Sequence, residues 1–292
     1  MKMYHISELE QLSGIKAPTI RVWERRYNLI QPGRTDTNIR LYDDQQVRKL
    51  LNVATLLDNG YKISKIAALE EEDLHAMVLG LQGPTAEGEA AATTFIHELV
   101  IAMLSYDEAG FERTYAAAVK RYGVFEAMLQ VMYPLLEKIG IMWSTADAMP
   151  VQEHFAAAVV RRKLITATDA LTIKKKRRKK FLLMLPPGEW HEIGLLLANY
   201  LIRSKDIETI YLGQNVPYEQ VSAVVAKAGV THLLLFYITR PVQDDLRQIR
   251  QQMALPRELP LLIAGSEYAT GGLRSAPATF LLQSPQELFK YL

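Results

Sequence analysis

A histidine with an acid two residues before it is the pair in this sequence best suited to hold a metal. Glu189-x-His191-x-x-Gly194 directly follows the apolar run 181–185. An imidazole can bind a metal through one ring nitrogen while a nearby carboxylate orients the other. Such a pair is a weak signal by itself, so its weight depends on where the fold places it.

A tryptophan and a second acid–imidazole pair stand earlier in the chain. Trp143 is followed, after nine intervening residues, by Glu153 and His154. An indole can wall off a bound ligand, while a carboxylate and an imidazole can hydrogen-bond it. The alternative is that Trp143 is a core residue and that the Glu-His pair caps its helix.

A third group of residues suits the major groove of a DNA duplex. We expect a helix over 17–27, with Ile20, Trp23 and Tyr27 facing inward. The other faces carry Lys16, Thr19, Arg21, Glu24, Arg25 and Arg26. Together with a preceding helix over 6–12, this helix forms a helix-turn-helix.

A hairpin with basic residues follows. A break at 31–33 leads to a polar turn and a return strand over 39–42. The side chains expected to contact DNA from this hairpin are Arg34, Thr35, Asn38, Arg40 and Tyr42. We predict that the hairpin is the wing of an all-α winged helix-turn-helix domain, which helices over 45–59 and 63–69 complete.

The run R-V-W-E-R-R-Y-x-L-I-x-P-x-R-T, followed by N-I-R-L-Y, resembles the DNA-binding domain of the MerR family of transcription regulators over residues 2–70. The resemblance implies a dimer on near-palindromic double-stranded operator DNA. Many relatives continue into one long dimerising helix. Here Gly80, Gly83, Pro84 and Gly88 break any sustained heptad, so we expect the C-terminal half to supply a homo-oligomer, either a dimer or a tetramer.

The chain after the DNA-binding domain, 1–75, divides into four further segments. They are a linker (76–91), an α-helical bundle (92–173), the basic run KKKRRKK (174–180) and a C-terminal domain (181–292). The bundle has about four helices, with breaks at 105–107, at Gly123 and at 140–150. We interpret the basic run as a solvated connection between domains, with contact to the DNA backbone as the alternative.

Strands and helices alternate through the C-terminal domain, which predicts a Rossmann-like, flavodoxin-like α/β fold with a parallel sheet. The strands are expected at 181–185, 209–212, 232–237, 261–264 and 279–282. Parallel sheets of this kind bind ligands at the carboxyl ends of their strands. Glu189 and His191 follow the first strand and therefore lie at that edge.

The loop around His191 and the segment 209–217 resemble cobalamin-binding domains, whose Asp-x-His-x-x-Gly motif supplies the lower axial ligand of cobalt. The Trp143 segment resembles light-sensing regulators of the CarH and LitR kind, in which it covers the upper face of adenosylcobalamin. The residues implied to bind the cofactor are Trp143, Glu153, His154, Glu189, His191, Gly194, Tyr237 and Gly265. The resemblance implies a repressor whose oligomerisation adenosylcobalamin controls.

Four positions depart from these relatives. Glu189 replaces an aspartate, Tyr237 stands where a small serine belongs, and Ala264 replaces the first of two glycines. Ser144 stands where light-sensing relatives have a second cobalt-binding histidine. The alternative is therefore the same DNA-binding regulator with a degenerate sensor, acting without cobalamin through oligomerisation or a protein partner. A cobalamin enzyme leaves residues 1–70 unexplained, so we expect no catalysis.

The composition supports a regulator in the cytoplasm. The chain has no cysteine, which excludes disulfides and thiolate metal sites. The start of the chain lacks the pattern of a signal peptide, and no apolar run is long enough to cross a membrane. The net charge is only +2, but residues 1–65 hold 11 Lys and Arg against 7 Asp and Glu. This local excess favours binding to phosphates.

Overall fold

The computed structural model describes residues 3–81, 89–144, 150–174, 178–238, 246–271, 273 and 277–292. The chain separates into two compact units, unit 1 (Met1–Val159) and unit 2 (Val160–Leu292). None of the helices in these described ranges is both long and apolar enough to span a membrane.

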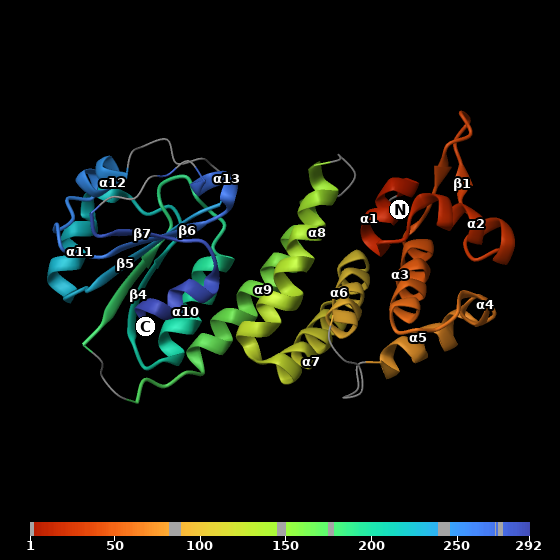
Figure 1. Ribbon diagram of the computed structural model, residues 1–292, viewed down its shortest axis with the longest axis horizontal. Helices are drawn as coiled ribbons and strands as arrows, with labels where there is room; N and C mark the ends of the chain where they lie inside the picture. Colours follow the sequence, from red (N-terminus) through yellow and green to blue (C-terminus); the bar gives the residue numbers. More distant parts are fainter. Residues whose placement is uncertain are drawn as a thin grey trace. The chain divides into compact units, whose positions relative to one another are not determined.

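Unit 1 opens with the expected helix-turn-helix and wing, which together with the following helices we call the head (Figure 1). Its elements are α1 (Ile6–Ser13), α2 (Ala17–Tyr27), β1 (Gly33–Arg34), β2 (Arg40–Leu41), α3 (Asp44–Asp58), α4 (Ile63–Ile66) and α5 (Glu71–Gly80). Asp43 caps α3 by accepting from the backbone N–H of Gln46 at 2.9 Å, while the Gln46 side chain accepts from the N–H of Asp43 at 3.0 Å. This reciprocal pair starts the helix at the predicted position.

The predicted linker at 76–91 is wrong at both ends. Helix α5 extends to Gly80, and the next helix begins at Glu89. Residues 82–88 of the predicted linker lie outside the described residues. The start of α5 carries Glu71, Glu72 and Asp73, and acidic side chains in a first turn favour a helix through its dipole.

The rest of unit 1 is the predicted helical bundle. It consists of α6 (Glu89–Leu104), α7 (Glu108–Ala127), a π-helical turn (Met128–Met132), α8 (Tyr133–Ser144) and α9 (Pro150–Asp169), whose second half belongs to unit 2. The predicted break at Gly123 is confirmed, because its φ of 76° interrupts the helical backbone inside α7.

The head packs directly on the bundle, which the sequence did not predict. Helix α3 lies against α6, and α1 lies against α8. The Thr55 hydroxyl contacts Nδ1 of the fully buried His97 at 2.7 Å. The Lys138 ammonium donates to the carbonyl of Leu12, near the end of α1, at 2.5 Å. The head and the bundle are therefore parts of one compact unit.

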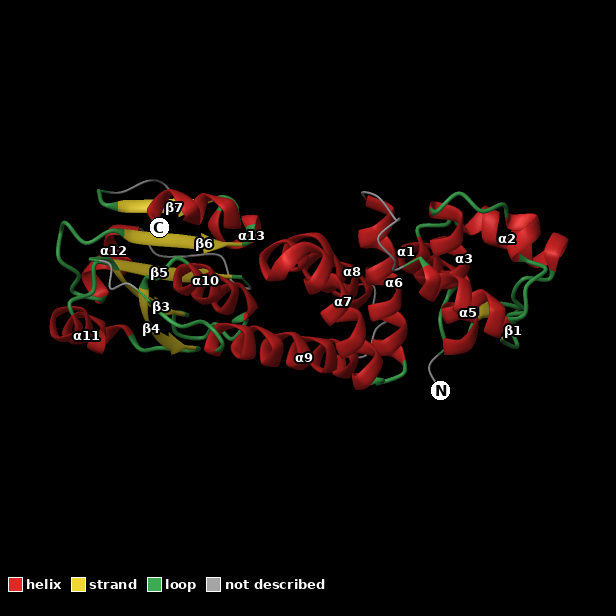
Figure 2. Ribbon diagram, turned by 90° about the horizontal axis from the view of Figure 1, so that it is seen from below, coloured by secondary structure: helices red, strands yellow, loops and turns green. Residues whose placement is uncertain are grey.

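Unit 2 contains the predicted parallel sheet, with strand order β4-β3-β5-β6-β7 (Figure 2). The strands are β3 (Lys180–Met184), β4 (Glu208–Gly213), β5 (His232–Tyr237), β6 (Leu261–Gly265) and β7 (Thr279–Leu282). The helices are α10 (Ile193–Ser204), a 3-10 turn (Tyr218–Gln220), α11 (Val221–Ala228), α12 (Leu246–Gln252), α13 (Glu267–Thr270) and a C-terminal 3-10 helix (Pro285–Tyr291). Helix α10 and the C-terminal helix cover one face, and α11 and α12 cover the other (Figure 1).

Burial on both faces explains why the strands are short apolar runs. Residues 181–184 of the central strand β3 are all fully buried, as covered parallel strands require. The predicted basic connection ends earlier than expected, because Lys179 donates to the carbonyls of Tyr291 (2.7 Å) and Leu292 (3.1 Å) and Lys180 begins β3. Residues 175–177 of the run lie outside the described residues.

The buried imidazole between the head and the bundle predicts acid sensitivity. Burial, and secondarily the charge of Lys138, lowers the pKa of His97 from 6.5 to about 3. The unfolded chain takes up this proton below pH 6.5, whereas the fold excludes it, so stability is complete above that pH and is lost toward pH 3. The free energy of unfolding should fall by about 1.4 kcal/mol for each pH unit in this window.

Urea unfolding of the wild type and of His97→Gln, between neutral pH and about pH 5, measures this slope. The variant should have a flatter pH dependence, and the exposed His75→Gln should keep the wild-type slope. Equal slopes in wild type and His97→Gln would show that another group carries the dependence.

Candidate functional site

The exposed face of α2 is the candidate DNA-reading surface. Arg21, Arg25 and Arg26 are exposed, and Ile20 is fully buried, as predicted. Trp23 and Tyr27 are only half-buried, so the inward face is narrower than expected. The structure thus presents a row of guanidinium groups along one helix.

The start of α2 is fixed by an acid from α1. Glu10 accepts from the Lys16 ammonium at 2.9 Å and from the backbone N–H of Ala17 at 2.8 Å. The Lys16 side chain nevertheless stays exposed, while Thr19 is half-buried. Both predicted residues lie at the first turn of the helix, where backbone N–H groups favour anions such as phosphate.

The wing presents a second polar surface, next to that of α2. The backbone N–H of Thr35 donates to the carbonyl of Ile39 at 3.0 Å, and the Thr35 hydroxyl accepts from the N–H of Ile39 at 3.0 Å. Asn38 adopts φ 64° in this turn, and its side chain accepts from Arg34. Arg34 and Asn38 are exposed at the tip, as a phosphate contact requires.

Two wing residues are not placed as predicted. Tyr42 is fully buried and its hydroxyl donates to Glu24 Oε1 at 2.5 Å, so the prediction that Tyr42 contacts DNA is wrong. Arg40 is 28% exposed and donates through Nε to Glu24 Oε2 at 3.1 Å. The Glu24 side chain is 7% exposed, so it does not belong to the solvent face of α2. Burial and the Glu24 carboxylate raise the pKa of Tyr42.

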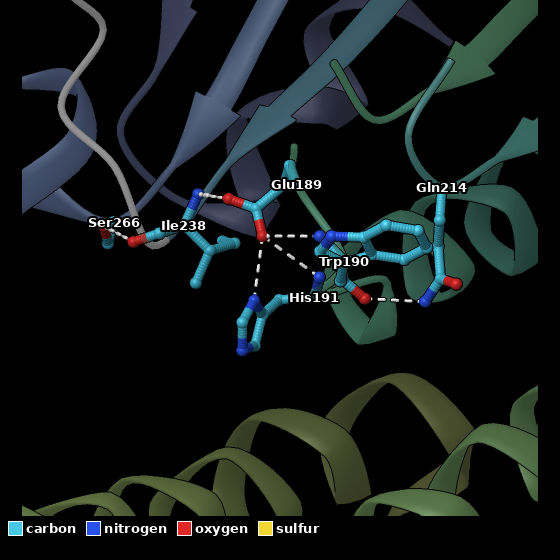
Figure 3. Close-up of polar contacts among 6 residues, drawn as sticks. All are labelled: Glu189, Trp190, His191, Gln214, Ile238 and Ser266. Carbon is cyan, nitrogen blue, oxygen red and sulfur yellow. Dashed lines mark hydrogen bonds and ion pairs between the residues drawn. The ribbon is translucent and has the colours of Figure 1, made fainter. Parts of the chain in front are cut away.

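The carboxyl edge of the parallel sheet is the candidate ligand site, shown in Figure 3. The buried Glu189 Oε1 accepts from Nδ1 of His191 at 2.8 Å and from the backbone N–H groups of Trp190 and His191 at 3.0 Å each. Its Oε2 accepts from the backbone N–H of Ile238, after β5, at 2.9 Å. The extra methylene of Glu189 is thus accommodated, and both of its oxygens have donors.

This arrangement fixes one edge of the imidazole and leaves the other edge available. With Nδ1 donating to the carboxylate, the neutral ring has its lone pair on Nε2, which is the nitrogen that binds a metal. The His191 side chain is 53% exposed. In the described part of the chain no three His, Asp or Glu side chains gather to hold a metal ion.

A second buried acid adjoins this loop and was missed by the sequence analysis. Glu192 forms an ion pair with Arg161 of α9 and accepts from the Tyr211 hydroxyl at 2.9 Å. Burial and the Glu192 charge raise the pKa of Tyr211. Trp190, exposed beside His191, was also missed. The sequence signal that could have identified Trp190 and Glu192 was their position on either side of His191, a candidate metal ligand.

The predicted glycines lie where other groups approach closely. A Cβ at Gly194 would meet the Phe236 ring at 2.8 Å, and a Cβ at Gly265 would meet the carbonyl oxygen of Tyr237 at 1.9 Å. The Tyr237 side chain is 8% exposed, and its hydroxyl contacts that of Tyr218 at 2.8 Å. A phenol pair therefore fills space beside the strand ends.

The predicted upper-face residues belong to unit 1. Glu153 is half-buried and His154 is exposed on α9. The side chains of Trp143 and Ser144 lie outside the described residues. Glu153 and His154 stand in the half of α9 that unit 1 contains, and His191 stands in unit 2.

Two family comparisons match separate parts of the chain. Residues 4–73 match the MerR HTH family regulatory protein, and residues 95–167 match the B12 binding domain. The corrinoid protein for monomethylamine of Methanosarcina barkeri superposes with a TM-score of 0.51 and 17% identity, covering 65% of this chain and 92% of its own. That likeness supports the fold alone.

Two relatives match along almost the whole chain. The transcriptional repressor CarH of Myxococcus xanthus is 30% identical over 91% of this chain and 89% of its own length. The repressor CarA of the same organism is 28% identical over 89% of this chain and 85% of its own. Both are transcriptional repressors rather than enzymes. The chain belongs to the CarH family of MerR-type regulators: it is a DNA-binding transcription regulator with a B12-binding domain.

Proposed function

We propose that this regulator represses transcription by binding operator DNA as a homo-oligomer, and that adenosylcobalamin bound at the sheet edge controls its assembly. The observation that carries the sensing part is the buried Glu189 carboxylate, which holds Nδ1 of a half-exposed His191. The match of residues 4–73 to the MerR family supports the DNA-binding part.

The residues at the strand ends fit a corrinoid on the side of its lower ligand. His191 would bind cobalt through Nε2, with Glu189 holding the tautomer. Gly194 and Gly265 keep the backbone free of side chains where neighbours already approach. From the resemblance of the Trp143 segment to light-sensing regulators, we propose that Trp143, Glu153 and His154 contact the same cofactor. When bound, adenosylcobalamin supplies a light-sensitive cobalt–carbon bond, which makes a light response possible.

Operator binding is assigned to α2 and the wing. A single head offers few base and phosphate contacts, so specific affinity requires two heads on repeated half-sites. We propose that Arg21, Arg25 and Arg26 reach the major groove, and that Arg34 and Asn38 contact the flanking backbone. The bundle and the sheet domain supply the assembly.

A sensor without cobalamin is the second candidate. The contact between the Tyr218 and Tyr237 hydroxyls favours it, because two partly or fully buried phenols occupy space beside the ligand edge. In that case the C-terminal half controls DNA binding through oligomerisation or a protein partner.

Replacement of the proposed cobalt ligand tests the sensing function. Purified protein is titrated in the dark with adenosylcobalamin and followed by visible spectroscopy and light scattering. The wild type should bind adenosylcobalamin with its nucleotide base detached from cobalt. The mass of the protein assembly should rise at the same time. His191→Ala should lose that spectrum and bind at least about ten-fold more weakly, because the metal loses a ligand.

His75→Ala, an exposed histidine on α5, is the matched control and should bind like the wild type. An unchanged spectrum in His191→Ala would show that His191 is not the cobalt ligand. If the folded wild type binds no cobalamin yet still binds DNA, the sensor without cofactor is correct.

Replacement of an exposed arginine on α2 tests the DNA-binding surface. The probe is the tightest duplex recovered from a random-sequence library, and binding is followed by fluorescence anisotropy at several salt concentrations. Arg21→Ala should weaken binding by about ten-fold, as expected for loss of one charged contact. Arg113→Ala on α7, which also replaces an exposed arginine, should keep full affinity. Equal losses of affinity in Arg21→Ala and Arg113→Ala would show that the exposed face of α2 is not the specific DNA-binding surface.

A further inference from the structure

Glu24 is an acidic residue on the helix proposed to enter the groove, yet its carboxylate is buried. Its neighbours Arg21 and Arg25 are exposed. Both of its oxygens have donors from the wing: Oε2 accepts from Arg40 Nε at 3.1 Å and Oε1 accepts from the Tyr42 hydroxyl at 2.5 Å. The acid therefore connects α2 to the return strand of the wing.

The wing needs such a connection because its own sheet is minimal. Two residue pairs join its strands, Gly33 with Leu41 and Arg34 with Arg40, and the turn adds the hydrogen bonds between Thr35 and Ile39. An isolated two-stranded hairpin is at best marginally stable in water. At its base, Tyr42 exchanges two backbone hydrogen bonds with Tyr4, of 2.7 and 2.9 Å, which fix the wing to the segment before α1 but not to α2. The contacts of Glu24 set the position of the wing relative to α2.

The Arg40 guanidinium is held in a way that leaves it able to bind a second anion. Glu24 uses only its Nε. Within the described residues, the two terminal nitrogens of Arg40 make no hydrogen bond. A guanidinium can donate two parallel hydrogen bonds to a phosphate, and one that is already oriented loses less rotamer freedom on binding.

We propose that Glu24 is a positioning residue for DNA binding, which orients Arg40 toward a backbone phosphate and fixes the wing against α2. Tyr42 supports the same carboxylate from inside the head. A buried ion pair adds little net stability compared with apolar packing, so the contribution of this pair lies in geometry. The proposal rests on the DNA-binding part of the proposed function.

Two interpretations of Glu24 predict opposite effects. If Glu24 were only a negative charge near DNA, Glu24→Gln would remove a repulsion and tighten binding. If Glu24 positions Arg40, the same variant loosens the guanidinium and weakens binding. Asp36→Asn at the exposed tip of the wing is the matched control, because it also removes one negative charge but has no role in orienting Arg40.

The experiment measures binding of these variants to the tightest duplex from the random-sequence library, at several salt concentrations. We expect Glu24→Gln to weaken binding by about ten-fold, and Asp36→Asn to bind equally or more tightly. The slope of log affinity against log salt should fall by about one in both Glu24→Gln and Arg40→Ala, since each loses the same phosphate contact. The double variant that combines Glu24→Gln with Arg40→Ala should bind no more weakly than Arg40→Ala alone.

The proposal is overturned if Glu24→Gln binds as tightly as the wild type, or if the two penalties add in the double variant. Circular dichroism and thermal unfolding check that each variant is folded. If Glu24→Gln unfolds, Arg40→Lys decides the question: it keeps the charge without Nε and should also bind weakly, whereas full affinity would overturn the proposal. Failure of the wild type to bind any duplex contradicts the proposed function instead.

Discussion

A carboxylate buried in this protein has to be given hydrogen-bond donors, and that requirement organises both functional regions. A buried charge without partners costs roughly several kcal/mol of folding free energy, so the chain must bring hydrogen-bond donors to it. Glu24 receives Arg40 and Tyr42, and Glu189 receives three backbone N–H groups and the imidazole of His191. In each case satisfying the acid fixes a side chain or loop on which the proposed function depends.

The loop between β3 and α10 shows how far this effect extends. Glu189 ties the loop to the end of β5 through Ile238. Glu192, three residues later, ties the start of α10 to Arg161 of α9 and to Tyr211 of β4. His191 lies between these two buried acids. Its ring is therefore oriented by Glu189 directly, while its backbone is held from three other elements of unit 2.

The limits of sequence-based prediction follow from the same interactions. The strands of unit 2 are predictable because covered parallel strands are short apolar runs, and the Glu189–His191 pair is predictable because its members are two residues apart. The partners of Glu24 lie 16 and 18 residues away, and only the folded hairpin brings them to it. Helical spacing therefore assigned Glu24 to the solvent face, and the position of Tyr42 in the hairpin assigned it to DNA.

The packing of the head on the bundle restricts how DNA binding can be controlled. Thr55 and His97 join α3 to α6, and Lys138 of α8 binds the end of α1 just before the helix-turn-helix turn. Because these contacts hold the head directly on the bundle, the position of α2 follows that of the bundle. In an oligomer, the spacing between two recognition helices then depends on how the bundles associate. Half-sites on DNA have a fixed spacing, so under the proposed function a change in assembly would be sufficient to change operator affinity.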